Sequence, residues 1–463
     1  MATLTFLGAA QQVTGSCYLL ETPTLGRVLL DAGLHQGGDF EGDMTMPLAF
    51  APKTIDTVIL SHAHLDHSGL LPVLVHQGFK GPIYCTKATA GLLRIMLKDA
   101  EGLYEKDLEY ANLRRARRGE KALKPAYTQR DVHTVLTLCE PIRYGECLLL
   151  GEGASLCFHD AGHILGSAIV ELKFRDGKHP RTLVFSGDLG KRNSVLMNDP
   201  EMLEHADLVM MESTYGDRDH EAMPDTLRQF EKVLRDTWAK KGNVLIPAFA
   251  VGRTQEILYY LGQLHDEGKL DHWQIFLDSP MAIEITQVYE SCSDLLDPED
   301  GCRLKVASMK HLVPQLRYAK TPDESRAINR VTHGAIIIAG SGMCTGGRIR
   351  HHLKQRIWNA RNTIVFAGFQ ARGTLGRRIA DGAKIITMFG DEFAVRARVE
   401  ILSGFSAHAG QSELVEWISH FRDAPRVMLV HGEPDALDAL AQKLWQEKKI
   451  ATEIPYPGQK IGF

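Results

Sequence analysis

Short apolar segments separated by glycine dominate the first 60 residues of the chain. Segments of this kind are typical of strands. They predict strands over residues 4–7, 16–21, 27–31 and 57–61. Helices are expected over residues 68–77 and 87–118. Strands return over residues 147–150, 155–159, 167–174 and 181–186.

The pattern changes between about residues 212 and 380, where apolar strands alternate with helices. The strands are predicted over 244–247, 274–277, 335–339 and 363–367. The helices are predicted over 225–240, 253–265, 281–291 and 347–358. Such alternation is typical of a parallel sheet covered by helices. The tail returns to strand, helix and strand over 397–402, 411–421 and 427–431.

These patterns predict an α/β protein in which one α/β domain is inserted into another. We expect the first domain to comprise residues 1–208 and 385–463, and the inserted domain residues 209–384. A length of 463 residues agrees with more than one core. Hydrophobic residues make up 44% and charged residues 24%, as in globular proteins.

The charge balance limits the kinds of partner. The 57 acidic and 53 basic residues leave a net charge of −4, which excludes a global basic field for nucleic acid. Any site for a polyanion must therefore be local. One basic run, Arg114-Arg115-Ala116-Arg117-Arg118, is either a solvated helix end or an outer phosphate contact.

The number and spacing of the cysteines and the first residues of the chain bear on where the protein is located in the cell. None of the eight cysteines forms a C-x-x-C pair, which argues against a zinc ribbon or a thioredoxin motif. Their density is too low for a disulfide framework. The first eight residues carry neither a basic segment nor a long apolar stretch, so we expect a first strand there. No run of 18 apolar residues predicts a membrane span. We therefore expect a cytoplasmic protein without a membrane partner.

The strongest chemical signal is the segment Ser61-His62-Ala63-His64-Leu65-Asp66-His67, which follows a predicted strand. It carries three imidazoles and one carboxylate within six residues. On a helix these side chains would diverge, whereas on a loop they can converge. Neutral imidazole and carboxylate are good zinc ligands, and open sites of this kind are catalytic.

Five further polar residues stand at or just beyond predicted strands: Asp31, His163, Asp188, His408 and His431. Each taken singly more often has a structural role. Their shared position favours a common site, because functional residues of α/β proteins gather at the carboxyl ends of strands.

The order of these residues resembles the motifs of a known family. Asp31, His62-x-His64-x-Asp66-His67, His163 and Asp188 look like the first four motifs of the metallo-β-lactamase superfamily. The segments Glu212-Ser213-Thr214-Tyr215-Gly216, Phe405-Ser406-Ala407-His408 and Leu429-Val430-His431-Gly432-Glu433 look like motifs A, B and C of its β-CASP branch. That branch comprises nucleases, including the endonuclease subunit of pre-mRNA 3′-end processing and its prokaryotic relatives. The implied fold is an αββα sandwich with an inserted β-CASP α/β domain.

The resemblance implies a site with two Zn²⁺ ions, for which Mn²⁺ could substitute. One ion would take His62, His64 and His163; the other would take Asp66, His67 and His431. Asp188 would bridge them with a hydroxide between. Asp31 would hold the ligands by hydrogen bonds.

The same resemblance suggests how a phosphodiester would be cut. Asp66 would orient the hydroxide and take its proton. His408 would protonate the leaving oxygen, and Glu212 would favour protonated His408 by hydrogen bonding to it. Family members often carry Asp soon after the motif B histidine, whereas Ala409-Gly410 follow here. The polar partner of that loop is therefore open.

The expected function is zinc-dependent, endonucleolytic hydrolysis of single-stranded RNA, because a histidine at motif C is typical of the RNA-cutting members. Tentative phosphate contacts lie in Gly-rich segments that permit close approach. They are Arg253, Ser341, Gly342, Arg348, Arg372 and Thr374.

Other functions remain open. A 5′-exoribonuclease or a DNA nuclease could use the same site. A hydrolase of small esters would not need the large inserted domain, and a non-catalytic RNA-binding scaffold would not need the complete ligand set. A homodimer is known among relatives, but no segment of the sequence indicates one.

Overall fold

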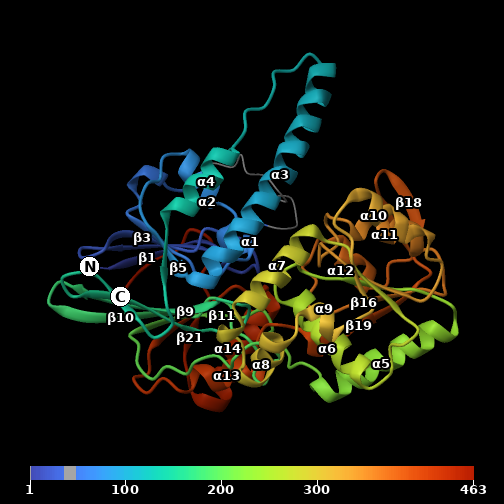
Figure 1. Cartoon of the computed structure of the whole chain (residues 1–463). Helices are drawn as coiled ribbons and strands as arrows, with labels where there is room; N and C mark the ends of the chain where they lie inside the picture. Colours follow the sequence, from blue (N-terminus) through green and yellow to red (C-terminus); the bar gives the residue numbers. More distant parts are fainter. Residues whose placement is uncertain (1, 36–47) are drawn as a thin grey trace.

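The computed structural model describes residues 2–35 and 48–463. Two lobes are visible in Figure 1, one around a pair of mixed sheets and one around a parallel sheet. The first sheet has the order β22-β1-β2-β3-β4-β5-β6. Its strands are β1 (Thr3–Gly8), β2 (Cys17–Thr22), β3 (Gly26–Leu30), β4 (Thr57–Ile59), β5 (Ile83–Thr86), β6 (Cys139–Ile142) and β22 (Lys460–Gly462).

The second sheet has the order β21-β20-β11-β10-β9-β8-β7. Its strands are β7 (Cys147–Gly151), β8 (Ala154–Asp160), β9 (Ala168–Asp176), β10 (His179–Phe185), β11 (Leu208–Glu212), β20 (Arg426–Val430) and β21 (Thr452–Glu453). Tyr18 of the first sheet packs edge-on against Phe185 of the second, with 5.4 Å between ring centroids. A buried apolar cluster drawn from both sheets therefore forms the centre of a sandwich.

Helices cover the outer faces of this sandwich. On the first sheet, residues of α2 (Leu71–His76), α3 (Lys87–Arg117) and α4 (Gln129–Leu138) join one apolar cluster. On the second sheet, residues of α13 (Gln411–Ile418) and α14 (Pro434–Lys448) join another. The layers are thus αββα, as the resemblance implied.

The inserted lobe contains a six-stranded sheet of order β14-β13-β15-β12-β16-β19, in which every pairing is parallel. The strands are β12 (Val244–Pro247), β13 (Gln274–Leu277), β14 (Leu316–Tyr318), β15 (Ala335–Ala339), β16 (Thr363–Phe366) and β19 (Arg398–Ile401). Its helices are α5 (Met223–Ala239), α6 (Arg253–Asp266), α7 (Pro280–Ser291), α8 (Pro298–Val306), α9 (Met309–Leu312), α10 (Pro322–Ala327), α11 (Ile349–Arg356) and α12 (Leu375–Ala380). A hairpin of β17 (Ile385–Met388) and β18 (Asp391–Ala394) stands apart from this sheet.

Strand pairing bears on the expected domain boundaries. Strand β11 pairs with β10 and β20, so the chain is still in the sandwich at Glu212. Strand β19 pairs with β16, so the chain is still in the inserted sheet at Ile401. We therefore propose to move the boundaries from 208/209 and 384/385 to positions just after β11 and just after β19.

Some elements differ from the sequence expectations. The helix expected over 68–77 is two helices, α1 (Leu65–Ser68) and α2, and Pro72 lies in the first turn of the second. The sequence pattern also did not predict strands β5, β6, β11, β14, β17, β18, β21 and β22 or helices α4, α8, α9, α10, α12 and α14. Cys147 and Cys157 form a disulfide between β7 and β8, although cysteine density did not indicate a framework. Within the described ranges, no helix is long and apolar enough to cross a membrane.

Candidate active site

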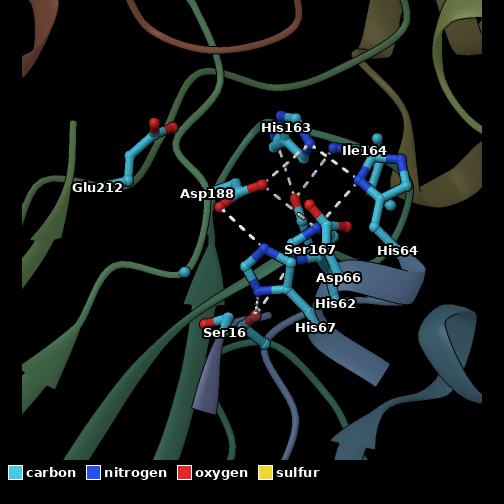
Figure 2. Close-up of polar contacts among 12 residues, drawn as sticks. Ser16, His62, His64, Asp66, His67, His163, Ile164, Ser167, Asp188 and Glu212 are labelled. Carbon is cyan, nitrogen blue, oxygen red and sulfur yellow. Dashed lines mark hydrogen bonds and ion pairs between the residues drawn. The ribbon is translucent and has the colours of Figure 1, made fainter. Parts of the chain in front are cut away.

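The histidine-rich segment follows β4 and continues into α1, and Figure 2 shows its side chains gathered with those of His163 and Asp188. It was expected to be a loop throughout, but Asp66 and His67 lie in the single turn of α1. Backbone hydrogen bonds hold this turn, because Ser16 N donates to Asp66 O and Ala32 N donates to His67 O. A Cβ on Gly33 would lie 1.7 Å from Asp66 O, so only glycine allows this close approach.

Four of the expected metal ligands form a first group in which one ligand atom of each lies within 4.8 Å of the others: His62, His64, His163 and Asp188. His64 Nδ1 lies 3.1 Å from His62 Nε2 and 3.3 Å from His163 Nε2. Asp188 Oδ2 lies 3.5 Å from His62 Nε2. Figure 2 shows these side chains converging on one point.

The other expected ligands form a second group beside the first: Asp66, His67 and His431. His431 Nε2 lies 3.9 Å from Asp66 Oδ2. Asp188 also reaches this group, because its Oδ1 lies 3.3 Å from His67 Nε2. A single carboxylate therefore stands between the two groups, with one oxygen toward each.

The atoms of the second group suit a cation. His67 Nε2, Asp188 Oδ1 and His431 Nε2 are buried and have no hydrogen-bond partner among the described residues. Burying such atoms without a partner costs about 1–3 kcal/mol each, which a metal ion would offset. Nitrogen and carboxylate donors in sets of three and four are those that zinc prefers.

The protonation states of the first group agree with metal binding. Burial holds the pKa of His62 and His163 well below the usual histidine value and lowers that of His64 to about 4. Neutral imidazole offers the lone pair that a metal needs. Burial alone would raise the pKa of Asp188, but the imidazoles of His431 and His67 hold it well below its usual range.

Asp31 does not face the ligand groups; it lies behind His67. Its Oδ2 lies 2.6 Å from His67 Nδ1, and its Oδ1 accepts the backbone N–H of Ser61 at 2.7 Å. The Ser61 hydroxyl also donates to Oδ2 at 2.8 Å. Because the carboxylate engages Nδ1, the Nε2 atom of His67 points toward Asp188.

The loop that carries His163 is fixed to the start of α3. The hydroxyls of Thr86 and Thr89 both donate to the carbonyl of Gly166, at 2.7 and 2.8 Å. Gly166 has φ +82° and a Cβ there would lie 2.7 Å from Thr89 N, so another residue would strain this turn. The hydroxyl of Ser167 accepts the backbone N–H of His163 at 3.1 Å.

Glu212, which is fully buried, and His408, which is partly buried, form a pair beside Asp188. His408 Nδ1 lies 3.0 Å from Glu212 Oε1, and Nε2 of the same ring has no hydrogen-bond partner among the described residues. Glu212 also accepts the backbone N–H of Leu189 at 2.8 Å and that of Thr214 at 3.1 Å. Burial lowers the pKa of His408, but the charge and hydrogen bond of Glu212 outweigh it, and the net pKa is raised.

The loop after His408 has polar partners that the sequence left open. His220 Nε2 donates to the His408 carbonyl at 2.9 Å. Glu413 accepts the backbone N–H of Gly410 at 2.8 Å, and Asp219 accepts that of Ser412 at 2.7 Å. The carboxylates of Glu413 and Asp219 thus hold the loop after His408, in which Ala409 and Gly410 offer no polar side chain.

The tentative phosphate contacts are not all available. Arg348 does not fit that role, because its guanidinium donates to Asp278 Oδ1 at 2.6 Å and to the carbonyls of Ala319 and Lys320. The hydroxyl of Thr374 is buried and caps α12 by accepting the backbone N–H of Arg377 at 3.2 Å.

The other candidate phosphate contacts differ in their burial and in their position relative to the metal-ligand groups. Arg253 is buried and paired with Glu256. Ser341 and Gly342 lie nearer the site, since Gly342 abuts the ring of Phe249, which is 6.2 Å from the His64 ring.

Arg372 bridges the two lobes. Its Nε lies 3.0 Å from Glu433, close in the chain to His431, and its guanidinium also donates to Asp435 at 2.6 Å. Its side chain is 59% exposed and that of Asp435 is 77% exposed, so this is a weak surface ion pair, unlike the pairing of Arg348 with fully buried Asp278.

Several supporting residues escaped the sequence analysis. Thr214 places its hydroxyl 3.2 Å from His431 Nδ1. Ser16 donates to Asp31 Oδ2 at 3.3 Å. Lys191 is buried and pairs with Glu256 at 3.2 Å, joining the sandwich to the inserted lobe. Thr214 stands within motif A, which was a signal; Ser16 and Lys191 carried none.

Comparisons with known proteins agree with this geometry. Residues 11–247 match the metallo-beta-lactamase superfamily, residues 254–379 the Beta-Casp domain, and residues 392–455 the Zn-dependent metallo-hydrolase RNA specificity domain. The chain therefore belongs to the metallo-β-lactamase superfamily and to its β-CASP branch. It is a hydrolase, one of its domains matches a family described as Zn-dependent metallo-hydrolases, and its histidine and aspartate side chains form a cluster that can hold metal.

Individual relatives span nearly all of the chain. It is 41% identical to Ribonuclease TTHA0252 of Thermus thermophilus over 94% of each protein. It is 33% identical to the RNase J-like protein of Methanocaldococcus jannaschii, over 99% of each. Transcription termination factor FttA of Methanosarcina mazei is 33% identical over 97% of this chain and 70% of its own length. A crystal structure of a protein of unknown function from Enterococcus faecalis shares the fold, with a TM-score of 0.55 at 13% identity.

Proposed function

We propose that this protein is a zinc-dependent endoribonuclease that hydrolyses phosphodiester bonds of single-stranded RNA. One observation carries the proposal: two groups of metal-ligand atoms share Asp188, and a carboxylate–imidazole pair stands beside them. Small-ester hydrolysis needs no such pair and no inserted lobe. The printed names of two relatives, a ribonuclease and an RNase J-like protein, support RNA as the substrate.

The two groups would hold two zinc ions. His62, His64 and His163 would bind one, Asp66, His67 and His431 the other, and Asp188 both. When bound, a zinc pair lowers the pKa of water toward about 7 and neutralises charge on a phosphate. Manganese is a candidate substitute for the same oxygen and nitrogen donors.

The protein's own residues would supply the proton transfers. Asp66, whose pKa the nearby imidazoles of His431, His67 and His64 lower against the effect of burial, is ionised and can orient a nucleophilic water and accept its proton. His408 Nε2 would give a proton to the leaving oxygen as the phosphorus–oxygen bond breaks. Glu212 would hold the His408 ring and favour its protonated form. Asp31 would position His67 and touch no substrate.

The phosphate backbone would be held at the join of the two lobes. Ser341, Gly342 and Arg372 are the candidates that the geometry leaves, because they lie near Phe249 and near the His431 segment. Arg253 lies deeper and would act by fixing Glu256. The cytoplasm is the compartment we propose, since cellular RNA is processed there.

The decisive experiment uses 5′-labelled linear RNA and circular RNA of the same sequence. Wild-type protein with zinc is expected to cut both, and His64→Ala and Asp66→Ala variants neither. Cutting of linear RNA alone, with release of single nucleotides, would establish a 5′-exoribonuclease instead. Matched DNA substrates test the sugar preference. If the zinc-loaded protein cuts no nucleic acid, the proposal fails.

Metal analysis is the companion measurement. We expect about two zinc ions per chain after purification with zinc, and one or none in His64→Ala and His431→Ala variants. Lys173→Ala, an exposed change far from the ligands, serves as a control and keeps two. A wild-type protein that binds no zinc or manganese would point to a non-catalytic RNA-binding scaffold.

A further inference from the structure

Helix α3 continues well beyond the body of the protein, as Figure 1 shows. Its last buried residue is Leu97, and the helix runs on to Arg117. At 1.5 Å per residue this free part is about 30 Å long. We call residues 98–124 the arm.

The arm is built as an ordered structure. The segment after the helix runs back along it, and the side chain of Asn112 exchanges two hydrogen bonds with the backbone of Leu123, at 3.1 and 2.7 Å. Tyr104 OH accepts the backbone N–H of Ala126 at 2.8 Å. These contacts fix the position of the side chains at the tip.

The tip is strongly basic on an acidic protein. Residues 114–124 carry six basic side chains and one carboxylate, a net charge of +5, whereas the whole chain has −4. Of the six, Arg115 pairs with Glu120 at 3.0 Å. The others have no ion pair among the described residues. Basic side chains in a last turn stabilise a helix, but Arg118, Lys121 and Lys124 lie beyond its end. The charge complements a polyanion.

The tip also offers surfaces for bases. Tyr110 is 65% exposed, and the guanidinium of Arg114 lies 5.9 Å from its ring centroid. Leu113, three residues along the helix, is 60% exposed. Exposed rings interleaved with arginine are typical of surfaces on which single-stranded bases stack.

The base of α3 lies at the candidate active site. Thr86 and Thr89, at its start, hold the carbonyl of Gly166 in the loop that carries His163. From Lys87 to Arg114 the helix spans about 40 Å. A polyanion that reaches from the metal-ligand groups to the tip must therefore be long.

We propose that the arm binds single-stranded RNA that flanks the scissile bond. Arg114, Arg117 and Arg118 hold its phosphates, and Tyr110 stacks on a base. The inference rests on the proposed function, and it makes long RNA a better substrate than short RNA. The arm acts on substrate binding and leaves the proton transfers unchanged.

The test compares a triple variant, Arg114→Gln/Arg117→Gln/Arg118→Gln, with a control that carries the same change of charge. Arg228→Gln/Arg326→Gln/Arg422→Gln serves as the control, because these side chains are about 70% exposed and distant in sequence from the arm. Substrates are RNAs of about 5 and about 40 nucleotides, below and above the span of one binding surface. Circular dichroism and thermal unfolding check that both variants fold.

For the long RNA, the arm variant is expected to raise KM roughly tenfold or more at unchanged kcat. The slope of log KM against log salt should fall by about 2, since each phosphate contact contributes about 0.7. The short RNA should be cut equally by all three proteins. Tyr110→Ala should raise KM for long RNA, whereas Tyr456→Ala, which removes another exposed ring, should not.

Binding of the long RNA is measured separately by fluorescence anisotropy in EDTA, where no cutting occurs. This binding measurement remains informative even if the wild type cuts no RNA. In that case the proposed function fails, while RNA binding by the arm is still tested. Equal affinity and salt slope for the arm variant and the control would overturn the RNA-binding arm. The proposal is also overturned if light scattering shows that the arm variant has a different oligomeric state while its RNA affinity is unchanged, because the arm would then be a protein contact.

Discussion

Replacing Glu212 by glutamine removes one charge at the centre of the candidate site and almost no volume. The carboxylate is fully buried and accepts three hydrogen bonds, from Leu189 N, Thr214 N and His408 Nδ1. Glutamine accepts only with its oxygen, so its amide group must face either Thr214 N or the pair of Leu189 N and His408 Nδ1. In both orientations Glu212→Gln removes the negative charge beside His408, and circular dichroism checks that the variant folds.

The size of the effect follows from the hydrogen bond between Glu212 and His408. A hydrogen bond to a charged group is worth about 1.5–3 kcal/mol. Since one pKa unit corresponds to about 1.4 kcal/mol, the pKa of His408 should fall by about one to two units. An imidazole that acts as general acid contributes about 10²–10⁴ to the rate, and part of this is lost when the ring is deprotonated. We expect kcat to fall about 100-fold at pH 8, with KM little changed.

Single-turnover cleavage of a short fluorogenic RNA between pH 5.5 and 9 measures this. The raised pKa of His408 keeps the ring protonated to higher pH, so activity is lost as pH rises through that pKa. In Glu212→Gln the alkaline limb should move to lower pH. A substrate with sulfur in place of the leaving oxygen needs no proton from the protein, and it should restore the rate of both Glu212→Gln and His408→Ala.

Glu171→Gln is the matched control, because Glu171 lies 3.3 Å from His159 in another carboxylate–imidazole pair. It should leave the activity profile unchanged. An alkaline limb that stays in place in Glu212→Gln, or sulfur substrate that rescues neither variant, would refute His408 as the acid. A loss of bound zinc in Glu212→Gln would also refute it, since the carboxylate would then act through the metal ligands.

Three further predictions concern the metal ligands and the stability of the fold. Asp31→Asn, which weakens the hold on His67 Nδ1, should lower zinc affinity about 10–100-fold in chelator competition. Asp56→Asn is the matched control. It replaces a carboxylate that accepts the backbone N–H of Arg27, and it should leave zinc affinity unchanged. Removal of zinc by EDTA should abolish cleavage and lower the melting temperature, and zinc at about 100 times its Kd should restore roughly 2.7 kcal/mol; an unaltered melting temperature would count against a metal-filled site. His159 is partly buried, which lowers its pKa, but the hydrogen bonds that it donates to Glu171 and Glu201 raise it to a greater extent. Its contribution to stability is therefore present in full below the usual histidine pKa and lost as pH rises through the raised value. His159→Gln should lower the melting temperature more at pH 5.5 than at pH 9, and an equal loss at both would contradict this.

The chemistry of the candidate site was readable in the sequence because residue type and spacing specify it. His62, His64, Asp66 and His67 lie within six positions, so local chain geometry alone brings them near one another. The αββα layers and the inserted parallel sheet followed from the strand patterns and the family resemblance. Residues 98–117 were predicted as helix, but the sequence did not show that they leave the body of the protein.

Contacts between distant segments were decided by the tertiary structure. Arg348 and Thr374 looked suited to phosphate, yet their polar groups serve Asp278 and the cap of α12. Lys191 carried no signal, although it joins the two lobes through Glu256. A hydrogen bond depends on positions in space to within a few tenths of an ångström, and sequence spacing fixes those positions only for near neighbours. The sequence by itself therefore determined which groups could hold metal, whereas packing of the strands determined that one carboxylate, Asp188, stands between both groups.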